Sequence, residues 1–215
     1  MKPESIKGQL KHLKIHTLPK DKIIFWDTSF VVDVLFSPNL ERVAELRKKT
    51  RNSEEGREFH KLEFLEYRHD AAVDFAERLI NENVNIAFSS ILFHELYFVF
   101  KYIELDKVYK DRKKTNEELK KNPKILTTHI PAIVRNWELF MNFLSKFKNR
   151  VVSISPSDPD IIKEILRIQI THGLNPNDSI HLGTMLAGKR KDIVVFDKRF
   201  KDAALQEGLN VWWKF

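Results

Sequence analysis

The sequence contains no cysteine and only six glycines among its 215 residues. Without cysteine the chain has no disulfide, no thiolate nucleophile and no zinc site with sulfur ligands, so any metal ion must bind oxygen or imidazole. Neither a glycine-rich phosphate loop nor a GxSxG motif is present, which argues against P-loop nucleotide binding and against α/β-hydrolase chemistry.

Long apolar segments are absent too, since no run of uncharged apolar residues approaches the length of about 18 that a membrane-spanning helix needs. Lysines are scattered through residues 1–22, which lack the apolar stretch of a signal peptide. We therefore expect a cytoplasmic protein with no membrane partner. The net charge of +7 and the pI near 9.4 favour a polyanionic partner, although acidic residues are also abundant and many basic proteins bind no nucleic acid.

The sequence does contain a recurring unit, in which an apolar segment ends at a polar corner and continues with apolar residues at helical spacing. Two examples are KIIFWDTSFVVDVLF (22–36) and VNIAFSSILFHELYFVF (84–100). Strands that alternate with helices predict right-handed crossovers and a parallel sheet covered by helices on both faces. Further strands are predicted at 151–154, 192–196 and 210–215, and helix starts at Asp158-Pro159 and Asn175-Pro176.

Two charge-dense stretches, 41–74 and 101–122, fall outside this alternation and have sparse apolar residues at helical spacing. The expected organisation is a basic N-terminal extension over 1–22 and one domain over 23–215, with exposed helical insertions at about 41–74 and 101–135. The second stretch is the more basic, and its candidate RNA contacts are Lys110, Arg112, Lys113 and Lys114. The alternative is that both stretches are only solvated faces.

Four acidic residues occupy informative positions, because ligands of an open parallel sheet bind beyond the carboxyl ends of its strands. Asp27 follows the first strand, Asp197 follows the fourth, Asp178 begins the preceding helix, and Glu95 lies among apolar residues of another helix. Clustered carboxylates repel one another unless a cation lies between them, and oxygen ligands favour Mg²⁺ or Mn²⁺. Structural roles stay open for each acid, as helix caps for the three aspartates and as a salt bridge for Glu95.

Other motifs in the same segments fail on inspection. HELYF (94–98) lacks the second histidine of a zinc peptidase, and DTS (27–29) lacks the second aspartate of haloacid-dehalogenase phosphatases. His181 lies one turn after Asp178, where either a substrate or metal-water contact or a structural hydrogen bond is expected.

In order and local wording, four segments resemble the acidic motifs of PIN-domain nucleases, particularly the VapC-type branch. These segments are FWDTSFVVDVL, SSILFHEL, LNPNDSIHLGTMLA and DIVVFDKRF. The resemblance covers residues 23–215 in outline and implies a three-layer α/β/α sandwich. It also implies a catalytic and metal-binding quartet of Asp27, Glu95, Asp178 and Asp197, with Thr28 or Ser29 as the small hydroxyl residue beside the first acid. Thr28, Ser29, Ser179 and His181 are the predicted supporting residues.

The predicted function is that of a Mg²⁺- or Mn²⁺-dependent endoribonuclease, whose ions activate a water for in-line attack on an RNA phosphodiester. The resemblance implies products with 5′-phosphate and 3′-hydroxyl ends. Two alternatives stay open, a noncatalytic RNA-binding or scaffold module and a structure-selective DNA nuclease. RNA is the expected partner. The sequence leaves open whether the chain is the toxin of a VapBC-type pair with an antitoxin protein, and whether it forms a homodimer.

Overall fold

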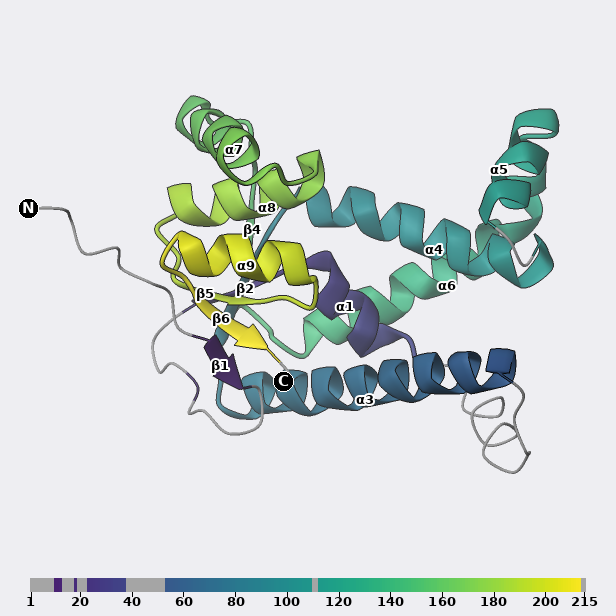
Figure 1. Cartoon of the computed structure of the whole chain (residues 1–215), viewed down its shortest axis with the longest axis horizontal. Coiled ribbons are helices and arrows are strands. Elements are labelled where there is room, and N and C mark those ends of the chain that lie inside the picture. Colours follow the sequence, from purple (N-terminus) through teal and green to yellow (C-terminus); the bar gives the residue numbers. More distant parts are fainter. Residues whose placement is uncertain (1–9, 13–17, 19–22, 38–52, 110–111, 214–215) are drawn as a thin grey trace, which may run out of the picture.

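A parallel sheet of six strands forms the centre of the computed structural model, which describes residues 10–12, 18, 23–37, 53–109 and 112–213 (Figure 1). The strands lie in the order β1-β6-β5-β2-β3-β4, and each pairs in parallel with its neighbours. They are β1 (Leu10–His12), β2 (Ile23–Trp26), β3 (Asn85–Ser89), β4 (Val151–Ile154), β5 (Asp192–Val194) and β6 (Asn210–Trp213). The strand order reverses beside β2, which is where open α/β sheets bind ligands.

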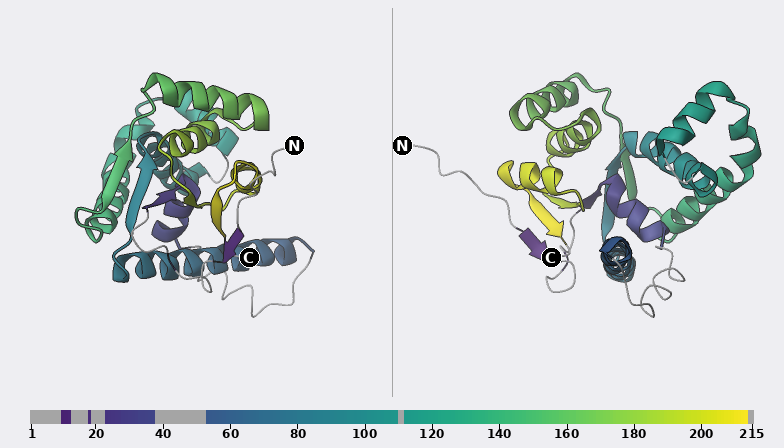
Figure 2. Two further views of the ribbon diagram at one scale, coloured as in Figure 1. Left: turned by 90° about the vertical axis from the view of Figure 1, so that its left-hand side faces the viewer. Right: turned by 45° about the vertical axis from the view of Figure 1, so that its right-hand side comes forward.

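Helices cover both faces of the sheet, as the two views in Figure 2 show. One layer holds α1 (Thr28–Leu35), α3 (Ser53–Asn81), α4 (Ile91–Tyr109) and α6 (Ile125–Ser145). The other holds α7 (Pro159–His172), α8 (Pro176–Ala187) and α9 (Lys198–Gln206), while α5 (Arg112–Lys121) contacts α4. The predicted three-layer α/β/α sandwich is confirmed.

Alternation along the strands divides the buried side chains between two cores. Ile24 and Trp26 of β2 belong to the core under α1, α3, α4 and α6, whereas Phe25 belongs to the core under α8 and α9. The first core is rich in aromatic rings, and Trp26 stacks on Phe143 with ring centroids 5.5 Å apart. Both faces of β2 are thus buried, which explains its continuously apolar sequence.

Residues 10–12 correct the expectation that residues 1–22 are only an extension, because they form the edge strand β1 beside β6. Lys11 Nζ lies 3.3 Å from the Asp192 carboxylate and 5.0 Å from the centre of the Trp212 ring. A strand of three residues is too short to show an alternating pattern in the sequence. Apart from Leu18, the rest of that extension lies outside the described residues.

The stretch 41–74 also differs from the exposed insertion that its charge density predicts. Residues 41–52 lie outside the described part of the chain, and the remainder belongs to the long helix α3. Ala71 and Ala72 are only 1% and 0% exposed, and they pack with Phe75 into the aromatic core. Small residues on one side of a charged helix allow this close approach, so α3 is a core helix at its C-terminal end.

Smaller differences concern element boundaries. The stretch 101–135 is divided among α4, α5 and α6, and it includes the buried side chains of Leu105 and Ile133. The strand predicted at 192–196 ends at Val194. Within the described residues, no helix is both long and apolar enough to cross a membrane.

Candidate functional site

Two of the predicted acids lie at helix starts on the same edge of the sheet. Asp27 follows β2 directly and caps α1, accepting a hydrogen bond from the Ser29 amide at 3.2 Å. Asp197 follows β5 and caps α9, with the Phe200 amide donating at 2.9 Å. Because β2 and β5 are neighbouring parallel strands, their carboxyl ends lie at one edge of the sheet. The two acids that cap the following helices therefore lie at that edge too.

The hydroxyls of Thr28 and Ser29 connect this corner to two other elements. Ser29 Oγ donates to the Asp27 carboxylate and accepts a hydrogen bond from the Phe196 amide at 3.2 Å, which joins the ends of β2 and β5. The Thr28 hydroxyl donates to the Glu95 carboxylate of α4. Ser29 therefore holds the carboxylate of Asp27, and Thr28 holds that of Glu95.

Glu95 is held by three side chains from two elements. Its Oε2 atom lies 2.7 Å from Nε2 of His181, a fully buried residue of α8. Thr28 and Asn177 also hydrogen-bond this carboxylate. Burial alone would raise the pKa of Glu95, but hydrogen bonds and the positive charge of His181 bring that pKa below its usual value.

The pKa of His181 is displaced in the complementary direction. Burial would lower it, whereas the hydrogen bond to Glu95 and the charges of Asp27, Glu95 and Asp178 raise it above its usual value. A protonated imidazole is thus favoured among the acids. Burial also raises the pKa of Asp27, despite its hydrogen bonds from Ser29.

Asp178 occupies the first turn of α8, as predicted, and forms a reciprocal pair with the N-cap Asn175. The Asp178 amide donates to Asn175 Oδ1 at 2.9 Å, and Asn175 Nδ2 donates to the Asp178 carboxylate at 2.6 Å. Burial and then the charges of Asp27, Asp197 and Glu95 raise the pKa of Asp178 to about 7. Since each of the other three acids acts on Asp178, the four carboxylates form one electrostatic cluster.

The chemistry of this cluster fits a hard divalent cation. Its donors are carboxylate oxygens that destabilise one another's charged forms, which is the condition that a bound cation relieves. Among the described residues, no three acidic or histidine side chains are already arranged around one metal position. A metal ion would therefore require these side chains to lie closer together, and Thr28 and His181 both contact Oε2 of Glu95.

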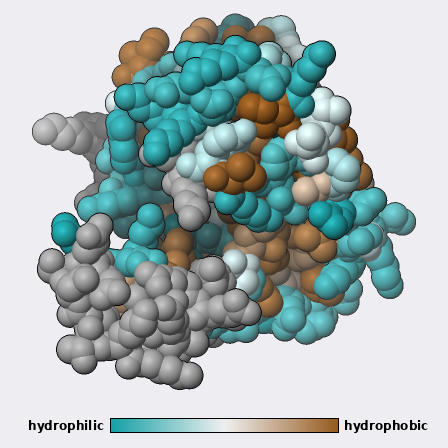
Figure 3. Space-filling view, turned by 90° about the vertical axis from the view of Figure 1, so that its right-hand side faces the viewer, coloured by the Kyte–Doolittle hydropathy of each residue, from teal (hydrophilic) through white to brown (hydrophobic). Residues whose placement is uncertain are grey.

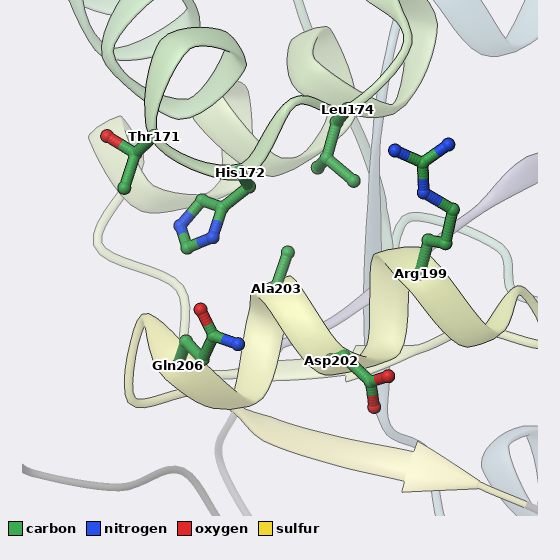
Figure 4. A pocket seen from close by; sticks show the side chains of 7 residues that line it. All are labelled: Thr171, His172, Leu174, Arg199, Asp202, Ala203 and Gln206. Atoms are coloured by element: carbon green, nitrogen blue, oxygen red, sulfur yellow. The ribbon is translucent and has the colours of Figure 1, made fainter.

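A separate hollow of about 260 Å³ lies between the C-terminal end of α7 and α9 (Figure 4). None of the four acids lines it, and two of its polar side chains already bind groups within the protein. Arg199 Nη2 donates to the Gly173 carbonyl at 3.0 Å, and His172 Nε2 lies 2.6 Å from the Glu207 carboxylate. The acidic cluster is thus distinct from this hollow.

Of the other predicted residues, Ser179 supports the helix that carries Asp178, and the basic residues lie apart from the acids. Ser179 Oγ donates to the Asn175 carbonyl at 2.9 Å, so its hydroxyl supports the start of α8. Arg112, Lys113 and Lys114 are exposed on α5, at the far end of α4, and Lys110 lies outside the described residues. The structure does not bring these cations to the carboxylate cluster.

Comparison with known proteins identifies the family of this chain. The sequence model of the PIN domain matches residues 62–205, more than half of the 215 residues. The chain belongs to the PIN domain family. The matched range includes Glu95, Asp178 and Asp197, whereas Asp27 precedes it. PIN domains are usually nucleases and generally use divalent metal ions.

A solved structure, "Crystal Structure of FitAcB from Neisseria gonorrhoeae", is similar to this PIN domain at 17% sequence identity. The similarity covers 89% of this chain and 97% of that chain, with a TM-score of 0.43. At that distance it carries no argument about function. No curated protein matches the sequence.

Asn177 is a residue of this PIN domain site that the sequence interpretation missed. Its side chain hydrogen-bonds Glu95 from the first turn of α8. The sequence contained a signal for this role. Asn177 directly precedes the predicted site acid Asp178 at a helix start, so its side chain is expected at the same edge of the sheet. In that segment we predicted Asn175 as the helix start and Asp178 as a site acid, and we gave Asn177 no role.

Proposed function

We propose that this PIN domain is an endoribonuclease that depends on Mg²⁺ or Mn²⁺. The observation that supports this function is the acidic cluster, in which burial and then the charges of Asp27, Asp197 and Glu95 raise the pKa of Asp178 to about 7. A protein gains little from storing such repulsion unless a cation offsets it.

Asp27, Glu95 and Asp178 would hold the cation directly or through water, and Asp197 would complete the site or orient a water molecule. When bound, the cation lowers the pKa of a water molecule and offsets charge on the leaving oxygen of the phosphodiester. Ser29 holds the Asp27 carboxylate, while Thr28, Asn177 and His181 hold that of Glu95. Such supporting hydrogen bonds commonly change metal affinity or activity by about 10- to 100-fold when they are removed.

RNA is the proposed substrate, with the exposed cations of α5 as backbone contacts that supply affinity without reading sequence. These cations are Arg112, Lys113 and Lys114, together with Lys110, which lies outside the described residues. The proposed nuclease domain spans residues 23–215, and β1 (Leu10–His12) adds an edge strand to its sheet. A VapC-type toxin role, an antitoxin partner and a homodimer remain predictions from the resemblance.

The test is cleavage of a mixed RNA pool and a matched DNA pool by wild type and Asp178→Asn, with Mn²⁺ or with excess EDTA. We expect Mn²⁺-dependent cleavage of RNA by the wild type, and loss of that activity in the variant. Cleavage that persists in EDTA would contradict the metal mechanism. RNA binding without cleavage in Mn²⁺ would instead favour the noncatalytic module, and preferential DNA cleavage would favour the DNA nuclease.

A further inference from the structure

Exposed aromatic side chains gather on α4 next to the acidic cluster, where a solvated helix would normally be polar. Phe98 is 39% exposed, Tyr97 is 41% exposed and His94 is also exposed. The Phe98 ring lies 4.8 Å from that of His94 and 5.6 Å from that of Tyr97, all on the same helix. Phe98 is therefore partly exposed to solvent instead of filling the core.

Two cations flank these rings. Lys101 Nζ lies 5.7 Å from the centre of the Phe98 ring and 5.1 Å from that of Tyr102. Arg112 of α5 covers the Tyr102 ring at 3.8 Å, and the Tyr102 hydroxyl donates to Asn116. Tyr102 thus fixes the start of α5 against α4. The result is a strip of alternating rings and positive charge, consisting of His94, Phe98, Lys101, Tyr102 and Arg112, which we call the α4 strip.

Phe98 of the α4 strip lies about one helical turn from Glu95 of the acidic cluster. Glu95, Phe98 and Tyr102 have the spacing i, i+3 and i+7, which places them along one side of α4. At a rise of about 1.5 Å per residue, Glu95 and Tyr102 are separated by roughly 10 Å along the helix axis. One or two unstacked nucleotides that extend from the acidic cluster along α4 would cover that length. Figure 3 shows the outer end of the molecule, where apolar residues are interspersed with hydrophilic ones.

We propose that the α4 strip is a binding site for unpaired bases of single-stranded nucleic acid. In this site a base stacks on Phe98, while Lys101 and Arg112 contact the neighbouring phosphates. Exposed rings bind any base through its π-face, and adjacent cations follow the phosphate backbone. The inference rests on the proposed nuclease function and adds a substrate preference to it, because bases paired in a duplex cannot reach the ring.

A protein partner is the other class of ligand that exposed aromatic residues can bind. The cations placed over Phe98 and Tyr102 favour nucleic acid, since a polyanion satisfies both features of the strip at once. An apolar partner helix would cover Lys101 without compensating its charge, which is unfavourable. Tyr97 lies on the far side of the helix from Glu95, and it is not part of the strip.

The experiment measures binding of a fluorescent single-stranded RNA of about 12 nucleotides, and of its duplex with the complementary strand, in Mg²⁺. All variants carry Asp197→Asn to prevent cleavage. Because one stacked base contributes about 1–3 kcal/mol, Phe98→Ala and Phe98→Leu should raise the Kd for the single strand at least about fivefold. Phe98→Tyr, which keeps a ring, should change it less than about twofold, and duplex affinity should be unchanged.

Lys101→Ala tests the second half of the α4 strip. It should reduce the slope of log K against log salt by about 0.7, the value for one phosphate contact on a single strand, whereas Phe98→Ala should leave that slope unchanged. Phe64→Ala on α3 and Lys163→Ala on α7 are the matched controls, because Phe64 is 46% exposed and Lys163 is exposed. Both controls should bind as the parent does.

A Phe98→Ala variant that binds single strands as tightly as Phe64→Ala would overturn the proposal, as would equal losses for single strand and duplex. The proposed function is tested separately by cleavage with the unmodified wild type. If wild type cleaves RNA but the Phe98 variants bind normally, only the α4 strip is wrong. If the Phe98 variants lose single-strand binding and wild type does not cleave, the strip stands and the nuclease proposal fails.

Discussion

Helix α4 carries two carboxylates that are both withdrawn from solvent, Glu95 near its start and Glu104 in its second half. Both have a pKa below the usual value, although burial acts to raise it in each. Glu104 is compensated by Lys107, whose Nζ lies 2.9 Å away, and by Asn136 Nδ2 at 3.1 Å. Glu95 has the imidazole of His181 and the neutral donors Thr28 and Asn177, and its charge acts on the nearby acids Asp27 and Asp178.

The comparison shows that burial and a shifted pKa do not by themselves mark a functional acid. Glu104 resembles a structural ion pair, in which one cation and one amide satisfy one carboxylate. Around Glu95 the acids outnumber the cations, and the repulsion appears in the raised pKa of Asp178. What separates the two ends of α4 is therefore the net charge of the neighbourhood.

The largest expected difference between the two acids is in catalysis. Glu95→Gln should lower Mn²⁺-dependent RNA cleavage by on the order of 100-fold or more, since losing a metal ligand exceeds the usual effect of losing its supporting hydrogen bonds. Glu104→Gln should retain cleavage and lose about 1–3 kcal/mol of folding stability, because Lys107 and Asn136 lose a charged acceptor. Equal activity in both variants would erase the distinction. Single-turnover cleavage and urea unfolding measure the two effects.

Metal binding should also distinguish the acidic cluster around Glu95 from Glu104, through the free energy of unfolding. At about a hundredfold excess over its dissociation constant, Mn²⁺ should stabilise wild type by about 2.7 kcal/mol. Glu104→Gln should gain the same amount, whereas Asp178→Asn should gain less than about half of it. Thermal unfolding with EDTA and with titrated Mn²⁺ measures these shifts, and identical shifts in all three proteins would return Asp178 to a purely capping role.

The metal-free protein should show opposite pH dependence at the two ends. The pKa of Asp178 is raised from 3.8 to about 7, so the folded state binds the additional proton and loses this contribution as pH rises between those values. Glu104 has a lowered pKa, so its contribution is present at neutral pH and is lost on acidification below 4.5. Relative to Asp178→Asn, wild type in EDTA should therefore lose stability between about pH 4 and pH 7. Urea unfolding across that range decides the sign, and a constant difference would contradict it.

The smallest expected effect concerns the basic helix α5 beyond Glu104. Changing Lys110, Arg112, Lys113 and Lys114 together to glutamine should reduce the slope of log K against log salt. The reduction should be about 0.7 for each phosphate of single-stranded RNA that these side chains neutralise. Mn²⁺-induced stabilisation should not change. A quadruple glutamine variant of exposed lysines elsewhere, Lys146, Lys148, Lys163 and Lys189, is the control. Equal slopes in the two variants would show that α5 is only a solvated face.

Local signals were sufficient for the elements next to the acids. Asp158-Pro159 and Asn175-Pro176 begin helices as predicted, and residues 151–154 form a strand with the predicted bounds. Each of these signals acts within a few residues, because a cap or a proline shapes its own turn. The capping role of Asp27 and Asp197 was likewise visible in the sequence as one of two open interpretations.

Contacts between distant residues decided the features that the sequence did not show. Strand β1 exists through its pairing with β6 and the contact of Lys11 with Asp192, and the end of α3 is buried because α1 and the sheet receive Ala71 and Ala72. Gly183 belongs to the same class, since a Cβ there would lie 2.7 Å from Ile165 of α7. No local pattern encodes such distances.

The sequence by itself determined the alternating fold class, the helix starts and the four acids at the ends of predicted elements, because periodicity and capping are local properties of the chain. Only the tertiary structure decided that three other acids raise the pKa of Asp178. It also decided that Asn177 and His181 both hydrogen-bond Glu95, and that Glu104 forms a satisfied ion pair with Lys107. The physical reason is that charge interactions depend on distance in space and on burial, and parallel strands bring together residues far apart in the chain.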